Sequence, residues 1–283
     1  MEQLKRKANC VPFEDCFLAF AKLTTCGFCQ RETVIKPVTT YSSASQSARV
    51  STEGWVAASV NCPACGGRLS ATPNNTRARD FLCSKCDDAF ELKSKKSRFG
   101  KTIVDGAYRT LVDAIRTNNA PNLFLLQYQL PFSAVNLSVL PKRFLVEPMV
   151  IKRKPLSALA RRAGWVGCNI DLSLIAANAL IPCLVDGRPV DQSIIQSKWA
   201  ETAPIDTVDY RGRGWIAITL GCISRIGKIE FTLAEIYGQE NIAARAYPDN
   251  RNVRAKLRQQ LQVLRDLGAV TFEGRGRYRL LWT

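Results

Sequence analysis

Four of the eleven cysteines are spaced as ligands of one metal ion. Cys62-Pro-Ala-Cys65 and Cys83-Ser-Lys-Cys86 are two Cys-x-x-Cys turns with 17 residues between them. Loops of about this length bring two such turns to one tetrahedral zinc ion, and the Gly-Gly pair after the first turn lets the chain fold back without a Cβ clash. We therefore predict a structural zinc site at these four cysteines. The alternative is two unrelated thiol pairs or redox sites.

A second set of reactive groups surrounds the second cysteine turn. Asp80 lies just before it, and Glu91-Leu92-Lys93 lies just after it, in a segment whose alternation predicts a strand. Side chains two apart in a strand share a face, so Glu91 and Lys93 should project together while Leu92 packs behind them. Two carboxylates can share a magnesium ion, and the lysine can orient or deprotonate the water that attacks a phosphorus atom. The alternative is that these residues are not catalytic and lie on the solvated surface of a hairpin that zinc holds together, because such a hairpin would contain the same residues.

The composition excludes several chemistries and favours a polyanionic partner. The 283 residues include 40 Lys and Arg against 24 Asp and Glu, a formal net charge of +16, and no histidine. Without histidine, catalysis must use carboxylates, lysine, thiolate or metal. The positive charge favours binding to phosphate backbones through counterion release. No stretch reaches the roughly 18 apolar residues of a membrane span, so we expect a soluble, unexported protein without a membrane partner.

The order of patterns predicts three segments. Residues 1–45 form an N-terminal appendage of unknown role, and residues 46–205 show a mixed pattern. Helices are predicted over 46–60, with Trp55 and Val56 inward, and over 105–117; strands are predicted over 123–128, 137–140 and 181–185. This order predicts an α/β fold in which helices flank a small mixed sheet. The appendage holds four more cysteines, which either bind a second metal or remain free thiols: Cys10, Cys16, Cys26 and Cys29.

Residues 210–283 predict a C-terminal winged helix-turn-helix domain. Helical patterns cover 214–226, 231–238 and 250–267, and two short strands follow around a glycine turn. Residues 211–283 hold 13 basic against 6 acidic side chains. The last helix should pack against the domain through Val253, Leu257, Leu261 and Leu264. Its opposite, basic face can then enter a groove of DNA. The alternative is that this basic face is solvated and binds no ligand. The predicted base-edge contacts are Arg254, Arg258 and Gln262, and the predicted phosphate contacts are Arg251, Arg275 and Arg277.

Longer motifs extend over both of these segments. They are Cys-Pro-Ala-Cys-Gly at 62–66, Asp-Phe-Leu-Cys-Ser-Lys-Cys at 80–86, Phe-Glu-Leu-Lys-Ser-Lys-Lys at 90–96, Asp-Gly-Ala-Tyr at 105–108, Arg-Arg-Ala-Gly-Trp-Val-Gly-Cys-Asn-Ile-Asp at 161–171, Arg-Gln-Gln-Leu-Gln-Val-Leu-Arg-Asp at 258–266 and Gly-Arg-Gly-Arg-Tyr at 274–278. Together they resemble the DpnI, or Dam-replacing, family of methyl-directed type II restriction endonucleases. The resemblance covers the chain from about residue 41 to its end, and both domains carry specific motifs.

The resemblance implies a zinc-bearing PD-(D/E)xK endonuclease domain joined to a winged helix, which cleaves double-stranded DNA at GATC sites carrying N6-methyladenine. On matching positions, Asp80, Glu91 and the carbonyl of Leu92 would hold Mg²⁺, Lys93 would position the water, and the four cysteines would hold Zn²⁺. Arg79 stands where the family pattern has proline. The implied setting is the cytoplasm of a bacterium that leaves its own GATC sites unmethylated, and no obligate protein partner is inferred.

Trp165 is the candidate sensor of the methyl group. A methyl group on adenine adds contact area but no hydrogen bond, so its recognition needs an apolar, aromatic-lined space. Arg161 and Arg162 lie in the same predicted loop, where they could clamp phosphate while the indole meets a base edge. A core tryptophan is the alternative.

Two other functions remain open from the sequence. One is a zinc-containing winged-helix transcriptional regulator without nuclease activity, which leaves the acidic residues and lysine around the second cysteine turn unexplained. The other is an endonuclease indifferent to methylation.

Overall fold

The computed structural model describes residues 43–73 and 79–282. Cys10, Cys16, Cys26 and Cys29, and with them the prediction of a second metal site, lie outside the described residues. Within the described part of the chain, no helix is long and apolar enough to cross a lipid bilayer.

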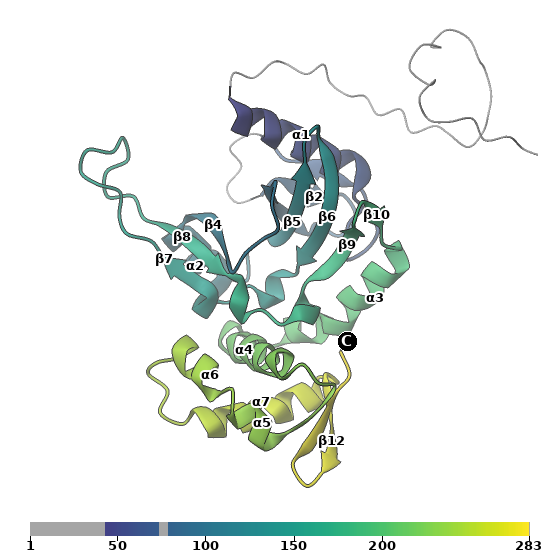
Figure 1. The fold of residues 1–283 in the computed structure, drawn as a ribbon, viewed down its shortest axis with the longest axis vertical. Helices are drawn as coiled ribbons and strands as arrows, with labels where there is room; N and C mark the ends of the chain where they lie inside the picture. Colours follow the sequence, from purple (N-terminus) through teal and green to yellow (C-terminus); the bar gives the residue numbers. More distant parts are fainter. Residues whose placement is uncertain (1–42, 74–78, 283) are drawn as a thin grey trace, which may run out of the picture. The chain divides into compact units, whose positions relative to one another are not determined.

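A mixed seven-stranded sheet carries the segment with the reactive groups (Figure 1). Its order is β1-β2-β3-β5-β6-β9-β10, and every neighbouring pair is antiparallel except β3 and β5. The structure confirms a mixed α/β fold, with a sheet that contains more strands than the four predicted for it. The strands are β1 (Leu69–Ala71), β2 (Phe81–Cys83), β3 (Ala89–Lys95), β5 (Asn122–Gln129), β6 (Ser133–Leu140), β9 (Ile181–Val185) and β10 (Arg188–Pro189).

Strand β5 is buried on both faces, which explains its continuous apolar sequence. Phe124 and Leu126 belong to a core cluster with helices α1 (Ala44–Ser59) and α3 (Gln192–Thr202). Leu123 and Leu125 belong to a second cluster with helices α2 (Tyr108–Arg116) and α4 (Tyr210–Ile226). The predicted first helix is α1, in which Val56 is fully buried and Trp55 is half-buried.

A second sheet holds three antiparallel strands, β4 (Thr102–Ala107), β8 (Gly167–Asp171) and β7 (Val150–Lys152), in the order β4-β8-β7. The prediction that a helix begins at residue 105 is wrong, because residues 105–107 belong to β4 and α2 begins at Tyr108. Pairing with β8 gives this backbone its hydrogen bonds, and Gly106 is a poor helix former. The connection between β7 and β8, residues 153–166, projects from the sheet (Figure 1) and is called the arm below.

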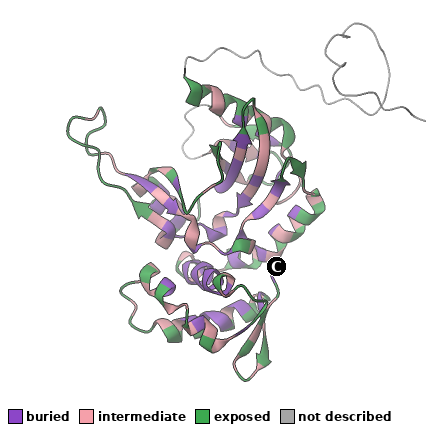
Figure 2. Ribbon diagram, in the orientation of Figure 1, coloured by how far each residue is buried: buried purple, intermediate pink, exposed green. Residues whose placement is uncertain are grey.

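The C-terminal part contains the predicted helices and the predicted hairpin, with helix α6 and strand β11 in addition. The predicted helix over 231–238 begins at Leu233, where Thr232 and Glu235 form a capping box. Helix α4 is buried over residues 213–223 (Figure 2), and its core cluster extends from Ile103 to Trp282. The elements are β11 (Glu230–Thr232), α5 (Leu233–Tyr237), α6 (Glu240–Ala246), α7 (Val253–Asp266), β12 (Val270–Gly274) and β13 (Arg277–Leu280), with sheet order β11-β13-β12.

Short 3-10 helices complete the connections. They are η1 (Lys142–Phe144), η2 (Glu147–Met149), η3 (Leu172–Leu174), η4 (Ala177–Ala179) and η5 (Ala203–Thr207).

Candidate functional site

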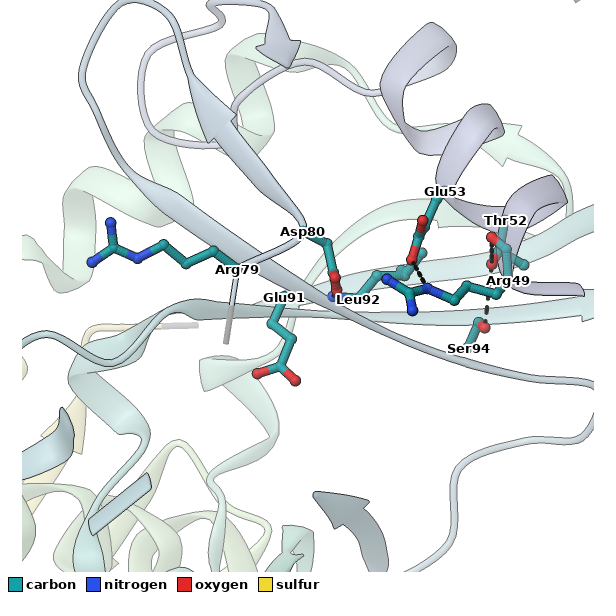
Figure 3. A pocket seen from close by; sticks show the side chains of 8 residues that line it. All are labelled: Arg49, Thr52, Glu53, Arg79, Asp80, Glu91, Leu92 and Ser94. Atoms are coloured by element: carbon teal, nitrogen blue, oxygen red, sulfur yellow. Dashed lines mark hydrogen bonds and ion pairs between the residues drawn. The ribbon is translucent and has the colours of Figure 1, made fainter. Parts of the chain in front are cut away.

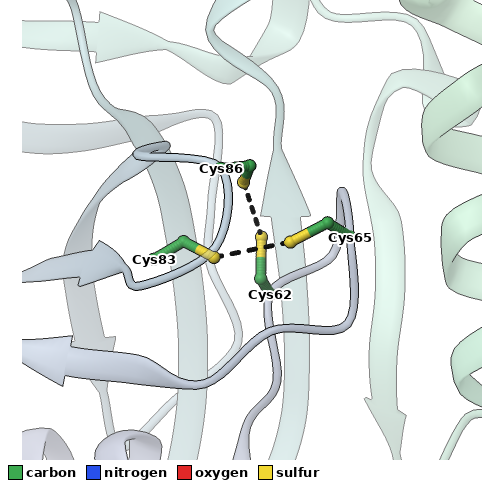
Figure 4. A group of neighbouring side chains, drawn as sticks. All are labelled: Cys62, Cys65, Cys83 and Cys86. Carbon is green, nitrogen blue, oxygen red and sulfur yellow. Dashed lines mark hydrogen bonds between the residues drawn. The ribbon is translucent and has the colours of Figure 1, made fainter.

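The four predicted cysteine ligands form one cluster (Figure 4). Their sulfur atoms all lie within 4.8 Å of one another, with 3.7 Å between Cys62 and Cys86 and 3.4 Å between Cys65 and Cys83. Zinc–sulfur bonds of about 2.3 Å in a tetrahedron place sulfur atoms roughly 3.8 Å apart. The cluster therefore fits a metal ion such as zinc, and the two cysteine turns do not form separate thiol pairs.

Local backbone geometry explains the residues in the turns. Gly66 has φ of +72°, and a Cβ atom on Gly67 would lie 3.0 Å from Sγ of Cys83. The backbone N–H of Lys85 donates to Sγ of Cys83 at 3.4 Å. Burial raises the pKa of Cys83, but hydrogen bonds from the backbone N–H groups of Lys85 and Cys86 outweigh it and lower this pKa to about 7. Cys83 thus favours the thiolate that a metal requires, whereas burial raises the pKa of Cys86 to about 12.

Two amide side chains, one buried and one half-buried, tie both turns to the rest of the domain. Asn122, at the start of β5, is fully buried and donates to the carbonyl of Ala89 at 3.1 Å. Its side-chain oxygen accepts from the backbone N–H of Lys142 at 2.8 Å. In the first turn, the carbonyl of Cys62 accepts from Nε2 of Gln192 in α3 at 3.0 Å. These bonds connect the cysteine cluster to β5, η1 and α3.

The β2–β3 hairpin joins the cysteine cluster to the acidic residues. Only two residue pairs define its register, Phe81 with Phe90 and Leu82 with Ala89, and the second cysteine turn connects the two strands. Beyond these pairs, the backbone N–H of Asp80 donates to the carbonyl of Phe90 at 2.9 Å. The turn that carries two of the cysteines therefore also sets Asp80 opposite the start of the Glu-Leu-Lys segment.

Lys93 lies between two carboxylates. Its Nζ atom is 2.6 Å from Oε1 of Glu91 and 2.5 Å from Oδ1 of Asp105, and all three side chains are at least four-fifths buried. Burial raises the pKa of Glu91 despite the nearby ammonium group. Burial alone would lower the pKa of Lys93, but the two carboxylates outweigh it and raise this pKa, so Lys93 is an ammonium ion at neutral pH.

Asp80 and Glu91 line one pocket of about 300 Å³ (Figure 3). Oδ2 of Asp80 accepts from the backbone N–H of Leu92 at 2.7 Å, while the Glu91 carboxylate points in another direction. The structure thus brings Glu91 and Lys93 into direct contact and places Asp80 on the same pocket. Carboxylate oxygens are the donors that magnesium prefers, and both carboxylates would have to turn to share one ion. The other lining residues are Arg49, Thr52, Glu53, Arg79, Leu92 and Ser94.

Sequence reasoning missed three polar residues of this site. Arg49 and Glu53 of α1 form an ion pair at 2.5 Å in the pocket wall. Asp105 reaches Lys93 from β4, in the second sheet. The Asp-Gly-Ala-Tyr motif includes Asp105, but a helix predicted from residue 105 gives the Asp105 side chain a different orientation from the one it has in β4. Nothing in the sequence alone indicates that α1 packs beside the acidic residues.

The arm carries the candidate methyl sensor at its base. Arg161 and Arg162 are exposed, whereas Trp165 is half-buried. A Cβ atom on Gly167 would lie 2.8 Å from the Trp165 ring, so the indole packs on the backbone where β8 begins. The arm holds no acidic residue, and Leu159 within it is 99% exposed. The exposed arginines and the half-buried indole lie on one projecting element.

Helix α7 has the two predicted faces. Leu257, Leu261 and Leu264 are fully buried and Val253 is half-buried, whereas the basic stripe is exposed. Within that stripe, Arg254 binds both carboxylate oxygens of Glu240, at 2.6 and 2.9 Å. The other three predicted DNA contacts at this helix have no ion-pair or side-chain hydrogen-bond partner among the described residues: Arg251, Arg258 and Gln262.

The β12–β13 turn presents two of its three arginines to solvent without a partner among the described residues. Arg275 has φ of +49° between two glycines of positive φ, and Arg277 follows it at the start of β13. Arg279 instead pairs with Glu230 at 2.5 Å. The first two are therefore exposed and available to an external anion.

Two sequence families match the chain. The Dam-replacing family (DpnI) matches residues 32–208. The Dam-replacing HTH domain (DpnI C-terminal) matches residues 211–280. The two matches together include the cysteine cluster, the acidic pocket, the arm and helix α7.

Proposed function

Because the chain belongs to the Dam-replacing (DpnI) family, we propose that it is a type II restriction endonuclease that hydrolyses double-stranded DNA with magnesium at GATC sites carrying N6-methyladenine. Membership in the family implies a methylation-dependent restriction endonuclease, and the C-terminal HTH domain implies a DNA partner. The GATC target and the position of the methyl group rest on the resemblance of the motifs.

One observation carries the catalytic part of the proposal: Asp80 and Glu91 line the same pocket, and Lys93 is bound to Glu91. The surrounding order of elements supports a PD-(D/E)xK core. Helix α1 precedes a hairpin that bears the acidic residues, and α2 lies in the crossover to the parallel strand β5. A purely structural hairpin would not need a buried lysine between two carboxylates. Burying charged groups costs free energy, and such clusters are typical of sites that bind a ligand.

The chain's own groups divide the reaction between them. Asp80, Glu91 and the carbonyl of Leu92 would hold magnesium, which supplies positive charge against the phosphate oxygens when it is bound. Lys93, as an ammonium ion, donates a hydrogen bond that orients the attacking water. The water oxygen forms a new bond to phosphorus and releases one proton to solvent as one phosphorus–oxygen ester bond breaks, and the departing oxygen takes up a proton from solvent. Zinc at the four cysteines would fix the hairpin and take no part in this step.

The C-terminal surface supplies the second DNA contact in the proposal. Arg258 and Gln262 project from α7 without partners among the described residues and suit base edges in the major groove. Arg254 can join them after exchanging Glu240 for a base. Arg251, Arg275 and Arg277 suit phosphates on either side.

Methyl recognition is proposed at the base of the arm. Trp165 offers one half-exposed aromatic surface, and the exposed Arg161 and Arg162 can hold the backbone of the same duplex. An adenine methyl group on the indole would exclude water from an apolar contact, whereas unmethylated adenine would leave that space poorly filled.

Digestion of one plasmid, prepared with and without adenine methylation at GATC, tests the proposal. We expect wild-type protein in magnesium to cut only the methylated plasmid. Asp80→Asn should abolish cutting while its amide oxygen still accepts from the backbone N–H of Leu92, which preserves the fold. Tight binding without cutting would support the transcriptional regulator, and equal cutting of both plasmids would support the methylation-indifferent endonuclease.

A further inference from the structure

We propose that Asp105 is a positioning residue for catalysis, which holds the ammonium group of Lys93 toward the attacking water. The inference rests on the proposed nuclease function and extends it to a residue of the second sheet. Asp105 acts through Lys93 and not as a ligand of the catalytic metal.

The geometry around Asp105 is specific to this contact. Its side chain is only 5% exposed, and its Oδ1 atom lies 2.5 Å from Nζ of Lys93. The carboxylate has no other hydrogen-bond or ion-pair partner among the described residues. An unpaired carboxylate at this depth would cost free energy, and the ion pair with Lys93 offsets that cost.

The backbone at Asp105 is adapted to present this side chain. In the β4–β8 ladder Asp105 pairs with Cys168 and Ala107 pairs with Gly167, with a register shift between them at Gly106. Irregularities of this kind redirect a side chain, and they are common next to active sites. The carboxylate thereby reaches from the sheet β4-β8-β7 to strand β3 of the other sheet.

A second partner for Lys93 becomes important when the metal binds. Glu91 is the other contact of the lysine, and in the proposed function it must turn toward magnesium together with Asp80. Without Glu91 as a partner, the flexible four-carbon side chain of Lys93 would sample several rotamers. Asp105 comes from a different element, so it can hold the ammonium group while Glu91 is engaged elsewhere.

A double-mutant cycle tests this assignment on the full-length protein. Single-turnover cleavage of a methylated GATC duplex is measured for Asp105→Asn, Lys93→Met and the double variant at an Mg²⁺ concentration that saturates the wild-type protein. We expect Asp105→Asn to slow cleavage about 10–100-fold, the range for groups that orient a catalytic residue. In the Lys93→Met background the same substitution should change the rate less than about threefold, because groups that act as a unit are not additive.

Asp113→Asn is the matched control. Asp113 is an exposed carboxylate on α2, so the substitution removes the same charge away from the pocket and should leave the rate unchanged. Duplex binding in Ca²⁺ and the melting temperature are measured for every variant. Asp105→Asn should retain both, since asparagine has nearly the same shape.

Several results would overturn the inference. Recovery of the Asp105→Asn rate at higher Mg²⁺ concentration would make Asp105 a metal ligand; this titration does not depend on the double variant. An equal loss in both backgrounds, or parallel loss of binding and melting temperature, would make its role structural. Full activity of Asp105→Asn beside an active wild type refutes this inference alone, whereas an inactive wild type refutes the proposed function together with it.

Discussion

Replacing one cysteine of the cluster, Cys83→Ser, should remove zinc, stability and cleavage together. The cluster closes the edge of the main sheet, and Leu69, Phe81 and Phe90 are buried on the strands that it joins. Each such side chain contributes about 1.5–3 kcal/mol on burial, so opening this edge costs roughly 5–9 kcal/mol. That is comparable with the whole stability of an ordinary domain, about 5–15 kcal/mol. The variant should therefore lose at least the hairpin that carries the acidic residues.

The measurement combines three readouts on purified protein. Metal content, by mass spectrometry or a chromogenic chelator, should fall by one zinc per chain. The melting temperature should fall by at least about 10 °C, from the scaling of stability with temperature for domains of this size. Cleavage of methylated plasmid should disappear, because Asp80 and Glu91 then lose their common hairpin.

Cys183→Ser is the matched control. Cys183 is a buried thiol on β9 in the same core cluster, but it lies outside the cysteine cluster. The substitution should cost about 1–3 kcal/mol for the buried hydroxyl while keeping zinc and cleavage. A soluble Cys83→Ser protein that lacks zinc and cuts at the wild-type rate would refute the reasoning.

Three further experiments probe other parts of the chain. Gly54→Ala should stabilise the protein by about 0.5–1 kcal/mol, because α1 is open there and alanine is the better helix former; Gly221→Ala in α4 should destabilise it, because the new Cβ meets a backbone carbonyl of η3. Thermal melting decides the sign of both. Arg258→Ala should reduce discrimination between target and altered sites by about 1–3 kcal/mol, whereas Arg275→Ala should weaken binding to all sequences and lower the salt slope by about 1. Trp165→Ala should leave binding to unmodified duplex intact and narrow the preference for methylated duplex; equal losses on both would indicate a packing role.

The features that could be predicted from sequence are those fixed by local geometry. The spacing of Cys62, Cys65, Cys83 and Cys86 sets two turns that can meet at one ion. The alternation along β3 sets Glu91 and Lys93 on one face. In both cases the residues lie close together on short turns or on one strand, so their spacing in the sequence is enough to predict which of them share a face or a site.

The missed features depend on contacts between distant elements. Asp105 was assigned to a helix because the apolar pattern of α2 begins near it, and pairing with β8 overrides that pattern. The ion pair between Arg254 and Glu240 joins α7 to α6, a helix that the sequence did not indicate. Neither partner could be identified before the packing of the elements was known.

The register of β3 connects the cysteine cluster to the proposed chemistry. Phe90 and Leu92 point into the core with α1 and α3, so Glu91 and Lys93 point the other way, toward Asp105. A slip of one residue would exchange the two sets and bury both charged groups in the apolar core. The short β2–β3 ladder offers little resistance to such a slip, whereas the parallel pairing with β5 and the cysteine turn each oppose it. The cysteine turn and the pairing with β5 therefore together hold the register on which Glu91, Lys93 and Asp105 depend.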